Sequence, residues 1–134
     1  MFLLDSNVVI AIINRRSEAA IARVHKEFAL GTVVFFSTIV YFELRYGISK
    51  STQAAKSEAL LREFMRSPIT IIPFEPADAE HAGDIRAGLN AKGTPIGPYD
   101  ILIAAQARSR GAVLVTGNRR EFDRVPGLAV ADWG

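Results

Sequence analysis

The sequence contains no cysteine. Disulfides, zinc–thiolate sites and thiol nucleophiles are therefore excluded, and the composition fits a reducing cytoplasm, where we expect the protein to act. No apolar run approaches the ~18 residues that a membrane-spanning helix needs, and the chain does not open with the pattern of a secretory signal. Only two histidines occur, His25 and His81, both on predicted helices away from the acidic residues described below. The chemistry of this chain is therefore expected to rest on oxygen-bearing side chains.

The composition is that of an ordinary globular protein. Its 134 residues, 49% of them apolar, suit a single domain spanning 1–134 with a substantial buried core. The formal net charge is only +2, which does not by itself identify a nucleic-acid binder. As a group, the arginines expected near the mouth of the site described below could hold a phosphate backbone: Arg15, Arg16, Arg119, Arg120 and Arg124.

Hydrophobic periodicity predicts strands that alternate with helices. Strands are expected at 2–4, 32–37, 69–72, 112–116 and 128–130. Helices are expected at 8–14, 17–30, 38–48, 51–66, 76–92 and 101–110, with a helical turn at 119–122. Ser17 is predicted to cap its helix and Gly31 to end it. Alternation of this kind, with strands that are apolar on both faces, predicts an α/β fold around a parallel sheet.

Polar side chains recur where the strands end. Asp5 follows the first strand, and Glu43 lies in the helix after the second. Asp100 opens the apolar helix that precedes the fourth strand, and Asn118 follows that strand. Ligands of open α/β sheets bind outside the carboxyl ends of the strands. We therefore expect three carboxylates and one amide to share one crevice.

Three carboxylates brought together repel one another unless a cation shares their pocket. Ligation by oxygen alone favours Mg²⁺ or Mn²⁺ over zinc. Such an ion can activate a water molecule and neutralise charge on a phosphate, so phosphodiester hydrolysis needs no serine or histidine nucleophile. The acidic pattern thus predicts metal-assisted phosphate chemistry.

Each acidic residue also has a structural interpretation. Asp100 could cap its helix, and Asp5 could be a turn residue at the end of its strand. Glu43 is harder to explain in this way, because an unpaired carboxylate between Phe42 and Leu44 would be costly. Phe42 itself is interpreted as a core residue. Four further residues are given structural roles: an ion pair for Asp84 with nearby Arg86, favourable helix-start positions for Asp78 and Glu80, and a C-terminal anchor for Trp133.

Four blocks of the sequence resemble the motifs of a known family. They are FLLDSN at 2–7, FELRYG at 42–47, IGPYDILIAA at 96–105, and VTGNRREF at 115–122 followed by RVPGL at 124–128. In this order they are similar to PIN-domain ribonucleases, in particular to VapC-type toxins of bacterial toxin–antitoxin pairs. The resemblance extends over essentially the whole chain.

The resemblance implies a three-layer α/β/α sandwich and Mg²⁺- or Mn²⁺-dependent endonuclease action on RNA. Asp5, Glu43 and Asp100 would form the metal site. Asn118 stands where some relatives carry aspartate, and Glu121 or Asp123 could take that role instead, which leaves one or two metal ions open. Further polar side chains are candidates for contacts with the metal's water molecules or with RNA: Ser6, Thr116, Arg119 and Arg120.

The resemblance also implies partners. VapC-type toxins are typically homodimers held by a cognate antitoxin, which inserts a basic side chain into the acidic pocket. Tyr41, Phe42 and Tyr46 are candidates to line the binding groove. The chain has no DNA-binding motif of its own, so operator binding would belong to the antitoxin.

Other functions are weighed on the same residues. A haloacid-dehalogenase-like phosphatase needs a second aspartate two positions after the first, where this chain has Asn7. A receiver-like phosphoacceptor needs an aspartate ending its third strand, which is not evident. No glycine-rich loop follows the first strand, so nucleotide binding is weakly supported. A non-catalytic PIN-like module that engages a protein or RNA partner stays open.

Overall fold

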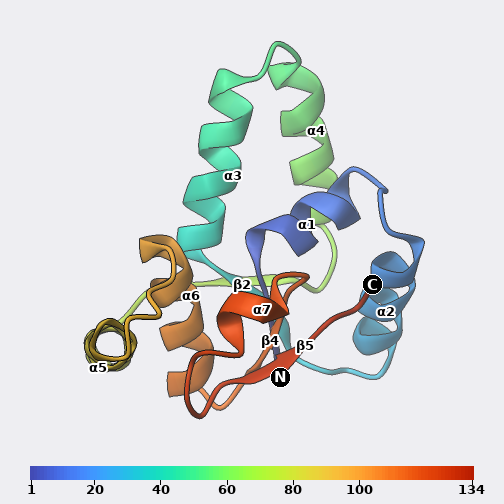
Figure 1. Cartoon of the computed structure of the whole chain (residues 1–134). Coiled ribbons are helices and arrows are strands. Elements are labelled where there is room, and N and C mark those ends of the chain that lie inside the picture. The colour runs from blue at the N-terminus through green and yellow to red at the C-terminus, as the bar shows by residue number, and fades with distance from the viewer.

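The computed structural model describes all residues 1–134 as alternating strands and helices around one parallel sheet (Figure 1). The strands are β1 (Phe2–Leu4), β2 (Val34–Ser37), β3 (Thr70–Ile72), β4 (Val113–Val115) and β5 (Ala129–Ala131). The helices are α1 (Ser6–Ile13), α2 (Glu18–Ala29), α3 (Thr38–Lys50), α4 (Ala54–Phe64), α5 (Pro76–Ala91), α6 (Pro98–Ser109) and α7 (Arg119–Phe122). The predicted α/β class is confirmed.

All four strand pairings are parallel, and the strands lie in the order β3-β2-β1-β4-β5. Figure 1 shows α5 and α6 on one side of the sheet and α2 on the other, while α3 and α4 rise together as an antiparallel pair. The central β1 is flanked by β2 and β4. The residues that follow these three strands therefore emerge beside one another at one edge of the sheet.

The hydrophobic core lies on both faces of the central strands. Leu3, Leu4 and Leu114 are fully buried, and every residue of β2 is buried. This is the pattern expected for parallel strands covered by helices on both faces. The short strands therefore hold the carboxyl edge of the sheet on a rigid base.

The predicted helix boundaries differ from the observed ones mainly at the N-termini. The helix expected from residue 8 begins at Ser6, because the side chain of Asp5 accepts a hydrogen bond from the Val8 N–H and caps it. The helix expected from residue 101 begins at Pro98, a residue type that suits the first turn. The helix expected over 51–66 is shorter, Ala54–Phe64, and ends before Pro68 is reached.

Several predicted local roles are confirmed. The Ser17 hydroxyl accepts a hydrogen bond from the Ala20 N–H at the start of α2. Gly31 adopts a positive φ of 72° just after that helix, as a left-handed helix stop requires. Trp133 is buried and meets the ring of Phe2 edge-on at 5.2 Å. No helix of the structure is long and apolar enough to cross a membrane.

Two acidic residues of α5 differ from expectation. Asp84 does form an exposed ion pair, but with Arg108 of α6 and not with Arg86. Asp78 does more than stabilise the helix start, because it is 1% exposed and forms a salt bridge with Arg110, the residue that follows α6. Sequence proximity therefore misidentified the partner of Asp84 and gave none for Asp78.

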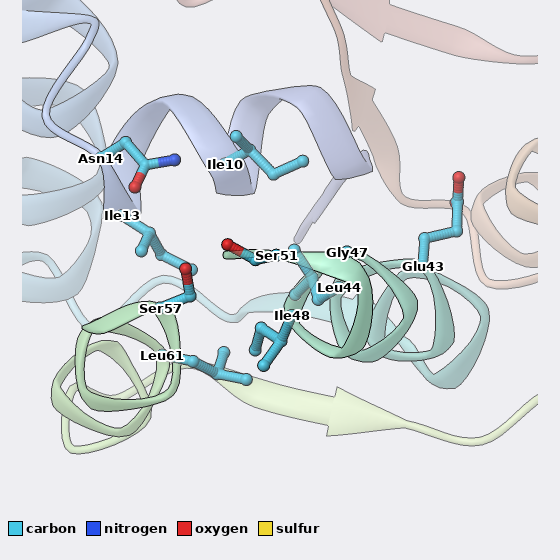
Figure 2. Close-up of a pocket in the computed structure, with 10 residues that line it drawn as sticks. All are labelled: Ile10, Ile13, Asn14, Glu43, Leu44, Gly47, Ile48, Ser51, Ser57 and Leu61. Carbon is cyan, nitrogen blue, oxygen red and sulfur yellow. The ribbon is translucent and has the colours of Figure 1, made fainter. Parts of the chain in front are cut away.

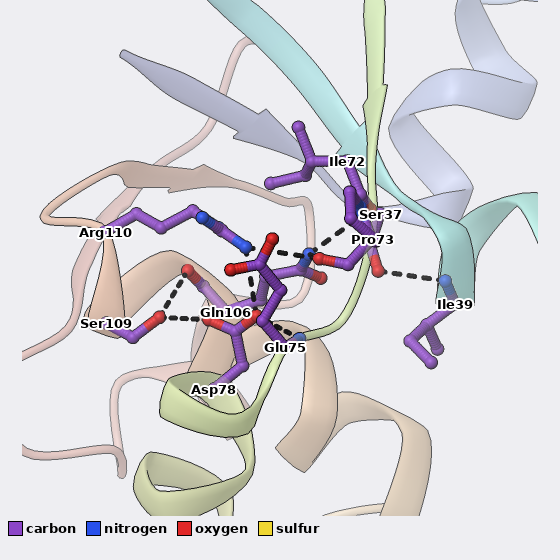
Figure 3. A network of polar contacts seen from close by, with 9 residues as sticks. All are labelled: Ser37, Ile39, Ile72, Pro73, Glu75, Asp78, Gln106, Ser109 and Arg110. Atoms are coloured by element: carbon purple, nitrogen blue, oxygen red, sulfur yellow. Dashed lines mark hydrogen bonds and ion pairs between the residues drawn. The ribbon is translucent and has the colours of Figure 1, made fainter.

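Figure 3 shows the network around Asp78, in which α5, α6 and the segment after β3 meet. The Glu75 N–H and Arg110 Nη2 donate to Asp78 Oδ2 at 2.8 and 3.0 Å, and the Ser109 hydroxyl donates to Oδ1. The buried Gln106 amide donates to the carbonyl oxygen of Pro73 at 2.9 Å. We refer to these residues as the Asp78 network. Its carboxylate is compensated by one cation and two further donors.

Candidate active site

The polar residues predicted at the strand ends gather at the carboxyl edge of the sheet. Asp5 directly follows β1, and Glu43 lies in α3, which directly follows β2. Asp100 lies in the first turn of α6, and Thr116 and Asn118 follow β4. The charges of Asp5 and Glu43 both act on Asp100. The predicted convergence is therefore present.

Asp5 is buried, and both of its carboxylate oxygens have partners. Oδ1 accepts from the Val8 N–H at 3.2 Å, and Oδ2 accepts from the Thr116 hydroxyl at 2.5 Å. Burial raises the pKa of Asp5, whereas the hydrogen bonds from Thr116 and from the backbone lower it. The turn role considered for Asp5 is thus a capping role, and Thr116 orients the side chain.

The structural interpretation of Asp100 as the cap of its helix is wrong. Gly97 occupies the capping position, and it provides no side-chain hydrogen bond. A Cβ at Gly97 would lie 3.2 Å from Asp100 Oδ2, so glycine leaves room for the carboxylate. The pKa of Asp100 is raised to about 6, mainly by burial and in addition by the charges of Glu121, Asp5 and Glu43 and by a carboxyl contact with Glu121. Asp100 is thus surrounded by acids.

Glu43 is positioned by Ser6. The Ser6 hydroxyl donates to Glu43 Oε1 at 2.6 Å, joining the start of α1 to the second turn of α3. Figure 2 shows Glu43 extending from α3 away from the other residues drawn there, which line an adjoining hollow. That hollow, of about 200 Å³, lies between α1, α3 and α4, and Glu43 is on its rim. The acidic residues at the edge of the sheet thus lie next to an apolar hollow between α1, α3 and α4.

Glu121 is the fourth acidic residue of the site. The Asn118 side-chain amide donates to Glu121 Oε2 at 3.2 Å, and the Asn118 N–H donates to the Thr116 hydroxyl oxygen at 3.0 Å. Asp123 instead pairs with Arg119 at 3.8 Å. The sequence left Asn118, Glu121 and Asp123 as alternatives. The three-residue spacing of Asn118 and Glu121 at the start of α7 was the available signal, because such residues are neighbours on a helix.

The donor set fits a hard divalent cation. Asp5, Glu43, Asp100 and Glu121 form no ion pair with arginine or lysine. No three acidic side chains are arranged to hold one ion directly. This is compatible with Mg²⁺, which usually keeps several water molecules and uses one or two carboxylates. We refer to the four carboxylates as the acidic cluster.

The predicted arginines are not all placed around the acidic cluster. Arg119 and Arg120 lie on α7 beside Glu121, and Arg124 donates to the Pro95 carbonyl oxygen at 3.1 Å. Arg15 lies beyond the far end of α1 and lines a separate hollow against α4, and Arg16 follows it. The expectation that Arg15 and Arg16 lie near the mouth is therefore wrong, because α1 carries the chain away from the site.

The prediction that Phe42 is a core residue is also wrong, because its side chain is 52% exposed. Its ring packs against that of Tyr99, with the centroids 5.7 Å apart. Tyr46, one helical turn further along α3, is 60% exposed, and Tyr99 is 48% exposed. The apolar sequence around Phe42 does not reveal this exposure, because only one side of α3 packs on the body of the protein.

Comparison with known proteins decides the family. The PIN domain model matches residues 2–128. The chain belongs to the PIN-domain family. It is 41% identical over 133 residues to the tRNA(fMet)-specific endonuclease VapC of Salmonella typhimurium, covering 98% of this chain and 97% of that protein. It is 39% identical to Ribonuclease VapC2 of Haemophilus influenzae over 132 residues, again covering 98% and 97%.

Solved VapBC complexes share the same PIN fold over nearly the full chain. VapBC2 of Rickettsia felis, bound to a DNA fragment from its promoter, matches with a TM-score of 0.93 and 32% identity, covering 99% of this chain and 98% of that one. DNA-bound VapBC of Salmonella typhimurium matches with a TM-score of 0.91 and 38% identity over the same shares. This PIN protein is thus similar to VapC ribonucleases, as the four sequence blocks predicted.

Proposed function

We propose that the protein is a metal-dependent endoribonuclease and the toxin of a VapBC-type toxin–antitoxin module. The observation that carries this proposal is the acidic cluster: four carboxylates at the carboxyl edge of the sheet, without a basic partner, in a chain of the PIN family. Such a cluster does not stabilise a fold, because each negative charge raises the free-energy cost of ionising the next acid. A bound cation would offset the repulsion among the carboxylates and could in turn bind the phosphate of a substrate.

Asp5, Glu43, Asp100 and Glu121 would hold the metal, for which Mg²⁺ or Mn²⁺ is the proposed identity. Nucleases of this family are generally metal-dependent. When bound, the ion would supply a Lewis acid that activates water and neutralises charge on the attacked phosphate. We leave the number of ions to experiment, because Asn118 adds an oxygen but no charge.

The neutral side chains of the site would act as positioning residues. Ser6 holds the carboxylate of Glu43, Thr116 holds that of Asp5, and Asn118 holds that of Glu121. Each of these three acids thus has a hydroxyl or amide donor that restrains its orientation without neutralising it. Preorganised carboxylates of this kind lose little conformational entropy when an ion or substrate arrives. Arg119 and Arg120 on α7 are the proposed phosphate contacts.

The proposed substrate is RNA, cleaved in the cytoplasm by hydrolysis of a phosphodiester bond. The Salmonella typhimurium relative is named for action on tRNA(fMet). With 41% identity over almost the whole chain, that tRNA is the first substrate to test. Structured RNAs with accessible loops suit a site that lies on an open edge of the protein.

The proposed protein partner is an antitoxin, supported by the VapBC complexes that share this fold. The hollow on whose rim Glu43 lies is lined by apolar side chains from three helices, among them Ile10, Ile48 and Leu61. An amphipathic helix of the antitoxin would fit there with its apolar face inward. From this position a basic side chain would reach the acidic cluster. A homodimer stays a prediction, which sedimentation of the purified protein tests.

The test of the enzyme proposal compares matched asparagine variants. The purified protein, free of antitoxin, is incubated with total RNA and with tRNA(fMet) in Mg²⁺, in Mn²⁺ and in EDTA. Asp5→Asn and Asp100→Asn should reduce cleavage by about 100-fold or more. Asp84→Asn should cleave normally, because Asp84 lies in an exposed ion pair with Arg108 outside the site.

Identical RNA profiles for the wild type and the two site variants in all metals would reject the enzyme proposal. The non-catalytic binding module would then be the better interpretation. The antitoxin proposal has a separate test, in which the chain is co-expressed with the small open reading frame expected just upstream. Failure of the two products to purify together would count against it.

A further inference from the structure

Three exposed aromatic side chains lie directly beside the acidic cluster. Phe42 and Tyr46 lie on α3, and Tyr99 lies on α6, with exposed fractions of 52%, 60% and 48%. The rings of Phe42 and Tyr99 are in contact, with centroids 5.7 Å apart and planes inclined by 58°. We refer to these three residues as the aromatic stripe. Exposed aromatic rings that gather in this way indicate a binding surface.

The aromatic stripe is joined to the acidic cluster through the chain itself. Phe42 immediately precedes Glu43, and Tyr99 immediately precedes Asp100. One helical residue turns the side chain by about 100°. Each helix therefore presents a carboxylate to the cluster and a ring to the adjoining surface, so a ligand bound at the acids extends naturally over the rings.

The spacing of the rings along α3 suits a single strand of nucleic acid. Phe42 and Tyr46 are four residues apart, so they share one face and are separated by about 6 Å along the helix. This is about the reach of one nucleotide in an extended strand. Lys50, four residues further, places its ammonium 4.9 Å from the centre of the Tyr46 ring. A positive charge therefore marks the distal end of the stripe.

Resting on the proposed ribonuclease function, we infer that the aromatic stripe stacks the bases of RNA that flank the scissile phosphate. The carboxylates of the acidic cluster repel the phosphates that flank the metal-bound one, so part of the affinity for RNA should come from contacts with the bases. Base stacking supplies it without dependence on phosphate charge and with little sequence preference. Lys50 contributes a cation at the distal end of the stripe, where it would meet a phosphate beyond the stacked bases.

The kinetic test uses two double variants with the same positions changed. Phe42→Leu with Tyr46→Leu keeps the surface apolar but removes both rings. Phe42→Tyr with Tyr46→Phe exchanges the two residues, so that both rings and the overall composition are kept. For RNA cleavage in Mg²⁺ the leucine pair should raise KM about tenfold, an effect within the range of stacking on one or two bases, and should change kcat little. The exchanged pair should resemble the wild type.

The binding test reads stacking directly and needs no activity. A short oligoribonucleotide containing 2-aminopurine is titrated with the protein in EDTA, in the Asp100→Asn background to lower the negative charge of the cluster. Stacking on aromatic rings should quench the fluorescence of 2-aminopurine. The exchanged pair should keep this quenching, and the leucine pair should lose it. Both pairs change exposed positions, so both should fold as the wild type does, which circular dichroism checks.

The two tests separate this inference from the function on which it rests. Quenching that depends on the rings, without RNA cleavage under any condition, would support the aromatic stripe and reject the nuclease. Cleavage with unchanged KM and unchanged quenching in the leucine pair would reject the aromatic stripe and keep the nuclease. A leucine pair that sediments as a smaller species, with quenching intact, would also overturn the inference and assign the rings to a protein interface.

Discussion

Asp78 and Asp100 are both acids in the first turn of a helix, yet their surroundings are opposite. Asp78 is 1% exposed, and Arg110, the Ser109 hydroxyl and the Glu75 N–H all bind its carboxylate. Asp100 is only partly buried, and its charged neighbours are three other carboxylates, of which Glu121 has the largest effect on its pKa. Burial alone therefore does not distinguish a functional acid from a structural one.

The two carboxylates differ in whether the protein places a positively charged side chain beside them. In the Asp78 network the protein supplies it, and the carboxylate joins α5 to α6. In the acidic cluster the protein supplies none, and the proposed function assigns that role to a cation from solution. A carboxylate whose pKa is raised by its neighbours is a functional-site candidate for this reason. Four experiments test this difference between the two acids.

The largest expected effect is on folding. Asp78→Asn leaves the partly buried Arg110 without its counter-charge. Loss of one partner of a pair whose carboxylate is buried should lower the free energy of unfolding by about 3 kcal/mol. Asp84→Asn is the matched control, because Asp84 lies on the same helix and also pairs with an arginine of α6 but is 79% exposed. It should change stability by less than about 0.5 kcal/mol. Urea unfolding of both variants measures this, and equal losses would contradict the contrast.

The next effect concerns catalysis and decides between two neighbouring acids. Glu121→Gln should lower the rate of RNA cleavage about 10- to 100-fold, the range seen when a group that supports a metal site is lost. Asp123→Asn should leave the rate near that of the wild type, since Asp123 pairs with Arg119 outside the acidic cluster. Cleavage kinetics with one RNA substrate compare them. A larger defect in Asp123→Asn would reverse the assignment.

A smaller effect is expected on stability as a function of pH. The pKa of Asp100 is about 6 in the folded protein against an ordinary value of 3.8, so the folded state binds the proton more tightly than the unfolded state. Stability from this group is therefore full below pH 4 and is lost as the pH rises through 6. In EDTA, Asp100→Asn should be more stable than the wild type by about 1–2 kcal/mol at pH 8, allowing for its partial exposure.

The same measurement at pH 4 should show almost no difference between the two proteins. Thermal unfolding at both pH values provides the comparison. A variant that is less stable than the wild type at pH 8 would mean that Asp100 gains more from its hydrogen bonds than it loses by repulsion.

The smallest effect is the response to the cation itself. At Mg²⁺ ten times above its dissociation constant, binding to the folded state alone should stabilise the wild type by about 1.4 kcal/mol. Asp78→Asn should gain as much, because the Asp78 network lies outside the acidic cluster. Asp100→Asn should gain little. Calorimetric scans with and without Mg²⁺ test this, and an equal gain in all three proteins would place the ion elsewhere.

The sequence predicts most of the fold because its strands and helices have different periods and clear boundaries. The turn at 119–122 has the same bounds in the structure, and each predicted strand overlaps an observed one. The acids Asp5, Glu43 and Asp100 could be predicted because the carboxyl ends of parallel strands share an edge. Their position follows from topology alone, before any side-chain contact is known.

What the sequence does not predict depends on contacts between elements far apart in the chain. The burial of Asp78 is set by Arg110, 32 residues away. The exposure of Phe42 depends on where α3 projects from the body of the protein, which apolar periodicity does not reveal. The choice of Glu121 over Asp123 depends on which side of α7 faces Asp100. In each case tertiary packing decides, and no local pattern carries that information.

Asp5 combines two duties in one side chain, with a consequence for genetics. One oxygen holds the start of α1 and the other meets Thr116, so substitution by alanine removes a helix cap as well as an acid. Cells selected to survive the toxin by losing Asp5 would thus include some whose protein no longer accumulates. Survivors altered at Asp100, which caps nothing, would carry a well-folded and inert protein still able to capture antitoxin.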